Sequence, residues 1–156
     1  MEDDETLRFL ADRGSRAKWV TSVCGGSIVL GAAGLMQGYK ATSHWAAREL
    51  LTNFGATPVE ARVVTDRNRV SGGGVTAGID FGLVLLAKLL GEDVAKMTQL
   101  ALEYDPAPPF DAGTPKKAGP EVMKDFLAWF GGAGNTLAPM CAAAGKKMDK
   151  YTPIAK

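Results

Sequence analysis

Residues 20–45, VTSVCGGSIVLGAAGLMQGYKATSHW, contain the pattern that decides the fold class. Residues 19–23 are rich in β-branched and aromatic side chains and predict a short, nearly apolar strand. Cys24 and two glycines follow, residues 28–33 predict an apolar helix, and residues 39–43 predict a second short strand. Strand, sharp turn, helix and strand in this order predict an α/β fold with a mostly parallel sheet.

The flanking segments continue the alternation of helices and strands. We expect helices at 4–13, ended by Gly14, and at 45–54, ended by Gly55. Residues 61–65 and 69–71 predict a β-hairpin with a polar turn, and residues 76–90 and 92–103 predict helices. Prolines then favour an extended segment at 105–115, followed by a helix at 120–130 and a glycine-rich linker at 131–135.

The predicted sheet has few strands for a doubly wound domain. A central parallel strand such as 19–23 needs a neighbour on each side, and the sequence offers only one or two further candidates besides the hairpin. We therefore expect the N-terminal strands of the domain to lie outside this chain or to come from another chain.

Length and charge narrow the function classes. The chain has 156 residues, which is the size of one domain, and 18 basic against 17 acidic residues give a net charge of +1. That balance offers no electrostatic reason to bind nucleic acid or an anionic membrane. The acidic residues 2–5 are the reverse of a signal peptide, and the apolar stretch 75–90 is interrupted by Asp80 and Lys88. A cytoplasmic protein is expected.

Cys24 is the candidate nucleophile. At the apex of a sharp strand-to-helix turn its side chain would be lifted out of the sheet, and the helix N-terminus would stabilise a thiolate. The backbone N–H of Gly25 would point to where negative charge develops on a substrate. The alternative interpretation is a buried cysteine that acts as a small apolar side chain.

Three other side chains have a chemical and a structural interpretation. His44 follows a strand end and could orient or pair with Cys24, but we favour a half-buried histidine beside Trp45. Asp105 is interpreted as a helix-end cap that could also face a pocket. For Asp80 we favour a helix-capping carboxylate over a catalytic one. With one histidine and two cysteines, of which Cys141 is interpreted as inert or disordered, the chain suggests neither a metal site nor a disulfide framework.

Three stretches resemble the DJ-1/PfpI superfamily, which has the class I glutamine-amidotransferase-like fold, and within it the isonitrile hydratases. They are residues 20–45 quoted above, DRNRVSGGGVTAGIDFGLVLLAKLLGE at 66–92 and LEYDPAPPFDAGTP at 102–115. The resemblance implies a flavodoxin-like three-layer sandwich, a homodimer, and Cys24 as the nucleophile. It assigns residues 1–130 to the family domain, in a form that lacks its N-terminal units and the acidic residue they contain. Residues 131–156 are left as an unmatched tail.

The implied reaction is the addition of water to an isonitrile, which gives an N-substituted formamide through a cysteine thioimidate and needs no metal or organic cofactor. The apolar residues at 79–90 and 104–110 would suit a small apolar substrate. Gly25 departs from the resemblance, because the hydratases commonly have a threonine there.

Other functions remain open. The chain could be a non-catalytic ligand- or redox-sensing domain in which Cys24 is oxidised, or a glyoxalase- or deglycase-like enzyme of the superfamily. A peptidase of the superfamily would have histidine in place of Gly25, and a DNA-binding regulator would need a helix-turn-helix domain that residues after 131 are too few to form.

Overall fold

A computed structural model describes residues 1–151, apart from the side chains of residues 132–135. The elements in chain order are α1 (Asp4–Arg16), β1 (Val20–Val23), α2 (Gly26–Ala32), β2 (Lys40–Ala41), the 3-10 helix η1 (Arg48–Phe54), β3 (Thr57–Pro58), β4 (Val63–Asp66), β5 (Arg69–Gly72), α3 (Ala77–Leu90), α4 (Glu92–Ala101), α5 (Pro115–Gly145) and η2 (Met148–Lys150).

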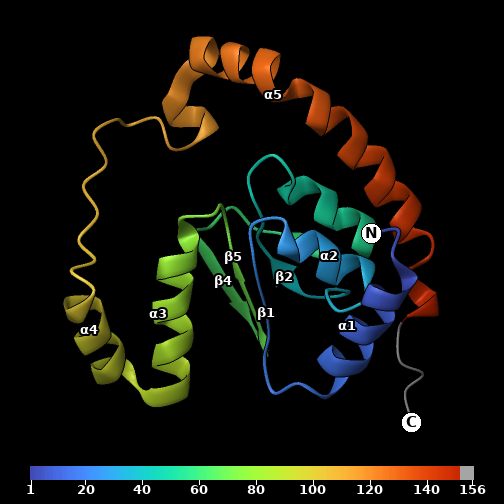
Figure 1. Ribbon diagram of the computed structural model, residues 1–156, viewed down its shortest axis with the longest axis horizontal. Helices are drawn as coiled ribbons and strands as arrows, with labels where there is room; N and C mark the ends of the chain where they lie inside the picture. Colours follow the sequence, from blue (N-terminus) through green and yellow to red (C-terminus); the bar gives the residue numbers. More distant parts are fainter. Residues whose placement is uncertain (152–156) are drawn as a thin grey trace.

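The sheet lies between two helical layers. Its strand order is β1-β5-β4, with β1 parallel to β5 and β4 antiparallel to β5, and β2 and β3 form a second, parallel pair. In Figure 1, α3 packs against one face of this sheet, and α1 and α2 lie on the other. The α/β class, the strand at 19–23 and the hairpin are therefore confirmed. Within the described residues, β1 is an edge strand with β5 as its one neighbour.

The main core lies between α1, α2, η1 and the C-terminal part of α5. Its largest fully buried members are Met36, Leu51 and Phe54, and Cys141 from α5 joins them with no exposed surface. The prediction of a linker at 131–135 is wrong, since α5 runs through it, and Cys141 is ordered core rather than disordered tail. A glycine within a helix lowers the stability of that helix by up to ~1 kcal/mol, and burial of side chains from the following helical turns offsets this loss.

Two predicted helix boundaries also change. Helix α1 continues through Gly14 to Arg16, because Gly14 serves a close approach and not a stop: a Cβ there would lie 2.5 Å from a methyl group of Leu35. The predicted helix at 45–54 is a 3-10 helix that begins only at Arg48. Its predicted stop is confirmed, with Gly55 in the left-handed region at φ 67°.

No helix in the described part of the chain is long and apolar enough to cross a membrane.

Candidate active site

The turn after β1 places Cys24 in an uncommon backbone conformation. Its φ is +58°, a left-handed value that few residues other than glycine adopt. The Cys24 N–H donates to the carbonyl oxygen of Gly73 at 2.7 Å and to that of Gly72 at 3.1 Å, while the Ser43 hydroxyl donates to the Cys24 carbonyl oxygen at 2.7 Å. The half-buried Cys24 therefore stands at a sharp strand-to-helix turn, and both its N–H and its carbonyl oxygen are held by hydrogen bonds.

Gly25 is the exposed N-cap of α2. Its φ of −66° and ψ of −12° suit any residue, and a Cβ built on it would meet no atom within 4 Å. The turn therefore does not require glycine at this position.

A buried network of hydroxyl groups supports the strand-to-helix turn at Cys24. The hydroxyls of Ser22 and Ser27 are 2.8 Å apart, and Ser27 donates to the carbonyl oxygen of Thr42 at 2.7 Å. The Thr42 N–H in turn donates to Ser71 Oγ at 2.9 Å. All four residues are buried, so the network joins β1, α2, the end of β2 and β5 with its hydrogen bonds satisfied.

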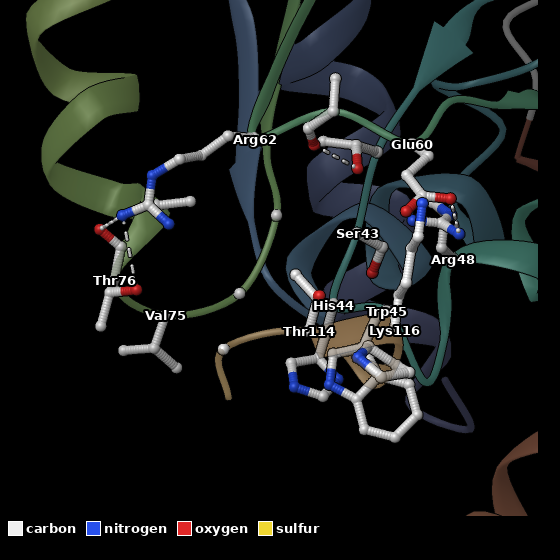
Figure 2. Close-up of a pocket in the computed structure, with 17 residues that line it drawn as sticks. Ser43, His44, Trp45, Arg48, Glu60, Arg62, Val75, Thr76, Thr114 and Lys116 are labelled. Atoms are coloured by element: carbon white, nitrogen blue, oxygen red, sulfur yellow. Dashed lines mark hydrogen bonds and ion pairs between the residues drawn. The ribbon is translucent and has the colours of Figure 1, made fainter. Parts of the chain in front are cut away.

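A pocket of about 820 Å³ opens beside this turn (Figure 2). Its lining comes from the segments that follow β2 and β5, from η1, from the loop before β4, from the first residue of α3, and from the start of α5 with the loop before it. The lining residues are Thr42, Ser43, His44, Trp45, Arg48, Glu60, Ala61, Arg62, Gly73, Gly74, Val75, Thr76, Ala77, Gly113, Thr114, Pro115 and Lys116. Cys24 is not among the lining residues, but its backbone is hydrogen-bonded to Ser43 and Gly73, which are. The carboxyl ends of parallel strands are where open α/β sheets place their ligands.

The charges around the pocket are largely paired. Arg48 forms ion pairs with Glu60 at 3.2 Å and with Glu49 at 3.3 Å. Arg62 pairs with Asp80, and this contact raises the pKa of the Arg62 guanidinium above its usual value. These pairs balance the charges of Arg48 and Arg62, and Lys116 adds one further positive charge to the lining.

Asp80 is not the helix cap that the sequence predicts. Its carboxylate binds Arg62 and also accepts from the hydroxyl of Tyr104 at 3.0 Å. Thr76, the N-cap of α3, makes no side-chain capping bond, and its carbonyl oxygen accepts from Arg62 at 2.9 Å. Asp80 therefore joins α3 to the strand β4 side of the pocket and to the segment after α4.

The structure brings some of the predicted residues together and leaves others apart. His44 lines the pocket, its ring centroid lies 5.3 Å from that of Trp45, and its Nδ1 accepts from the Ala46 N–H at 3.3 Å. Asp105 is exposed and does not line the pocket, and neither do residues 79–90 and 104–110, so the predicted apolar lining is wrong.

Sequence reasoning missed Arg48, Glu60, Arg62 and Lys116, which reach the pocket from separate parts of the chain. The sequence signal for a binding site was the rule that ligands bind at the carboxyl ends of parallel strands. That rule points to Ser43 and Gly73, but it does not point to these charged residues. In the part of the chain that the structure describes, no three His, Cys, Asp or Glu residues are grouped so that they could hold a metal ion.

Comparison with known proteins places the chain in a family. The DJ-1/PfpI family pattern matches residues 1–88. Isonitrile hydratase of Pseudomonas putida is 55% identical over 125 residues, which are 80% of this chain and 55% of that protein. The HTH-type transcriptional regulator GbdR of Pseudomonas aeruginosa is 30% identical over 93 residues, 58% of this chain and 25% of the regulator.

The crystal structure of a ThiJ/PfpI family protein from Pseudomonas syringae superimposes with a TM-score of 0.84 at 52% identity, over 92% of this chain and 57% of that one. The chain thus spans little more than half the length of these two closely similar relatives. The sequence pattern, the identity and the shared flavodoxin-like fold agree, and the chain belongs to the DJ-1/PfpI family.

Proposed function

We propose that this chain supplies the nucleophile of an isonitrile hydratase-like site, which adds water to an isonitrile and releases an N-substituted formamide. The left-handed conformation of Cys24 at the end of β1 is the observation that supports the proposal most directly. Backbone strain of this kind costs of order 1–3 kcal/mol and is concentrated at functional sites. The 55% identity to the Pseudomonas putida isonitrile hydratase points to the same reaction.

The chemistry requires one nucleophile and one proton donor. The Cys24 thiolate attacks the terminal carbon of R–N≡C while that carbon takes up a proton, so a C–S bond and a C–H bond form and the thioimidate R–N=CH–S results. Water then adds to the same carbon as the nitrogen is protonated. Loss of the C–S bond returns the sulfur as thiolate and releases R–NH–CHO together with one proton.

The neighbours of Cys24 have separate roles in this scheme. The Gly25 N–H faces the negative charge that develops on the substrate. His44 orients the pocket wall beside Trp45 and does not transfer the proton. The carboxylates that contact the pocket's two arginines are engaged in those ion pairs, Asp80 with Arg62 and Glu60 with Arg48. We therefore propose that the proton donor is a carboxylate from a segment outside this chain.

The unpaired edge of β1 suggests how the sheet is completed in the assembled protein. We propose that β1 receives a further strand from that same segment, and that the complete domain is a cytoplasmic homodimer. Its small, apolar substrate is taken up without a metal or an organic cofactor.

The test combines this chain with the N-terminal part of a longer family member, either fused or as a separate chain. Following formamide production from an aliphatic isonitrile by chromatography, we expect turnover that Cys24→Ala abolishes. His44→Ala should reduce turnover only severalfold. Turnover that survives Cys24→Ala would refute the assignment of the nucleophile.

The likeness to a transcriptional regulator over 93 residues favours sensing as a second candidate. In that case the complemented protein would produce no formamide, and dilute peroxide would convert Cys24 to the sulfinate before Cys141 reacts. Mass spectrometry of the two cysteine peptides decides between the candidates.

A further inference from the structure

The carbonyl oxygen of Cys24 is held by a side chain from another part of the chain. The hydroxyl of Ser43, nineteen residues further on, donates to it at 2.7 Å. The Cys24 N–H donates only to backbone carbonyl oxygens that follow one another at the end of β5. The N–H of Ile28, which a regular helical turn would direct to the Cys24 oxygen, donates to Gly25 instead at 3.1 Å. The orientation of the Cys24 carbonyl group therefore depends on Ser43.

This carbonyl group and the N–H of Gly25 belong to the same peptide unit. A trans peptide is nearly planar, and its C=O and N–H bonds point in opposite directions. A hydroxyl that fixes the direction of the Cys24 carbonyl therefore also fixes the direction of the Gly25 N–H. Donation to the oxygen also polarises the peptide and makes its N–H a stronger donor. Ser43 thus acts on the N–H that, in the proposed function, faces the developing negative charge.

The backbone that carries Ser43 has little freedom to move. Ser43 is 2% exposed, and the residue before it, Thr42, is held by three hydrogen bonds. The Thr42 N–H donates to Ser71 Oγ at 2.9 Å, and its hydroxyl donates to the carbonyl oxygen of Ala61 at 3.0 Å. The Thr42 carbonyl oxygen accepts from the hydroxyl of Ser27 at 2.7 Å. The hydroxyl of Ser43 is therefore presented to Cys24 from a fixed base.

Ser43 also lines the pocket, directly before His44 and Trp45 (Figure 2). We propose that Ser43 is a positioning residue, which acts through the peptide between Cys24 and Gly25 to aim the Gly25 N–H and to hold the left-handed turn that carries the sulfur. This inference rests on the proposed function. A strained backbone conformation persists only where its surroundings fix it at several points, and Ser43 supplies the one side-chain bond to the Cys24 backbone among the described residues.

Nuclear magnetic resonance can observe this peptide alone in the full 156-residue chain. Cys24 is followed by glycine, whereas the other cysteine, Cys141, is followed by Ala142. With ¹³C at the cysteine carbonyl carbons and ¹⁵N in the glycines, a spectrum that correlates each N–H with the preceding carbonyl contains one signal, that of the Cys24–Gly25 peptide. We expect Ser43→Ala to move its carbonyl carbon and its amide proton to lower frequency, because the carbonyl has lost its donor and the N–H is less polarised.

The kinetic test uses the complemented protein. Removing an oxyanion-hole donor outright lowers kcat by about 100- to 1,000-fold, and Ser43→Ala leaves the donor in place but less well aimed, so we expect kcat to fall by about 10- to 100-fold. KM should stay within about twofold, as expected for an interaction made mainly in the transition state. Ser43→Thr, which keeps the hydroxyl, should restore both the signal and most of the lost kcat.

Thr98→Val is the matched control. The Thr98 hydroxyl is partly buried and donates to the carbonyl oxygen of Val94 at 2.9 Å within α4, and Thr98 does not line the pocket. This variant therefore also loses one hydroxyl-to-carbonyl bond, and it should leave both the Cys24–Gly25 signal and kcat unchanged. Urea unfolding of both variants shows whether each is folded under the assay conditions.

The inference is overturned if folded Ser43→Ala leaves the Cys24–Gly25 signal at its wild-type position, or if it lowers kcat no more than Thr98→Val does. With turnover that still requires Cys24, either result leaves the proposed function in place. The converse is also distinguishable. If the complemented wild-type protein releases no formamide, the proposed function fails, and a signal that moves in Ser43→Ala and returns in Ser43→Thr would still support the control of this peptide by Ser43.

Discussion

The left-handed conformation of Cys24 predicts an inverted order of stability for two variants that lack its thiol. At most positions alanine is more stable than glycine by about 0.5–1 kcal/mol, because glycine loses more backbone freedom on folding. At φ +58°, however, a residue with a Cβ carries about 1–2 kcal/mol of steric strain that glycine avoids. Cys24→Gly should therefore exceed Cys24→Ala in free energy of unfolding by about 0.5–1 kcal/mol.

Urea unfolding followed by circular dichroism measures this difference, at one fixed protein concentration so that any association affects both variants equally. For a chain of this length about 1 kcal/mol corresponds to a shift of about 2–4 °C in Tm. The control is Ala142→Gly at an exposed position of α5, which should lower stability by about 0.5–1 kcal/mol.

The reasoning fails if Cys24→Gly is less stable than Cys24→Ala by the margin that the control shows. That result would mean that the turn after β1 stores no strain. Both variants lack the thiol, so the comparison separates the conformation of the turn from its chemistry.

Four further outcomes are expected. Iodoacetamide at pH 6–7 should label Cys24 and spare Cys141, which has no exposed surface and whose thiol pKa is raised by burial; peptide mapping that finds Cys141 labelled first would contradict this. Gly25→Thr should leave the melting temperature within about 1 °C, because its Cβ meets nothing, and should raise turnover in the complemented protein by placing a hydroxyl beside the sulfur. The chain alone should associate through the open edge of β1, so that sedimentation shows species larger than the monomer; a monomer with one sharp unfolding transition would count against it. Lys150 lowers the pKa of the Asp4 carboxyl, so the stabilisation from that contact is present above the carboxyl's unfolded pKa and lost as the pH falls through its folded value. The protection of backbone amides near residue 148 against hydrogen exchange, taken relative to the intrinsic exchange rate at each pH, should fall below about pH 4 in the wild type and lose that dependence in Asp4→Asn.

Features set by neighbours in the sequence were predictable. The turn at Cys24 and the hairpin between β4 and β5 depend on residues a few positions apart, and Gly55 ends η1 as expected. Their signals are local backbone preferences, which a single sequence displays directly.

Features that depend on contacts between distant parts of the chain were not predictable from the sequence. Glycine commonly ends a helix, so Gly14 looks like a helix stop in the sequence. The Leu35 side chain that packs over it comes from another part of the chain. Asp80 is well placed to cap a helix until Arg62 and Tyr104 are brought to it. The glycines at 131–135 predict a linker, and only the burial of Cys141 ten residues on reveals why the helix continues.

The two ends of the described chain meet in space. Asp4 binds Lys150 at 2.7 Å and also Tyr151, so α1 begins where η2 ends. A short linker between the termini would let the chain be cut instead in the exposed segment 105–114, as a circular permutant that starts with α5 and ends with α4. The strand-to-helix turn of Cys24 would then lie in the middle of an uninterrupted sequence. The pocket-lining residues 113–116 would then lie at the new N-terminus, where the length of the chain before them could be varied residue by residue without changing the sheet.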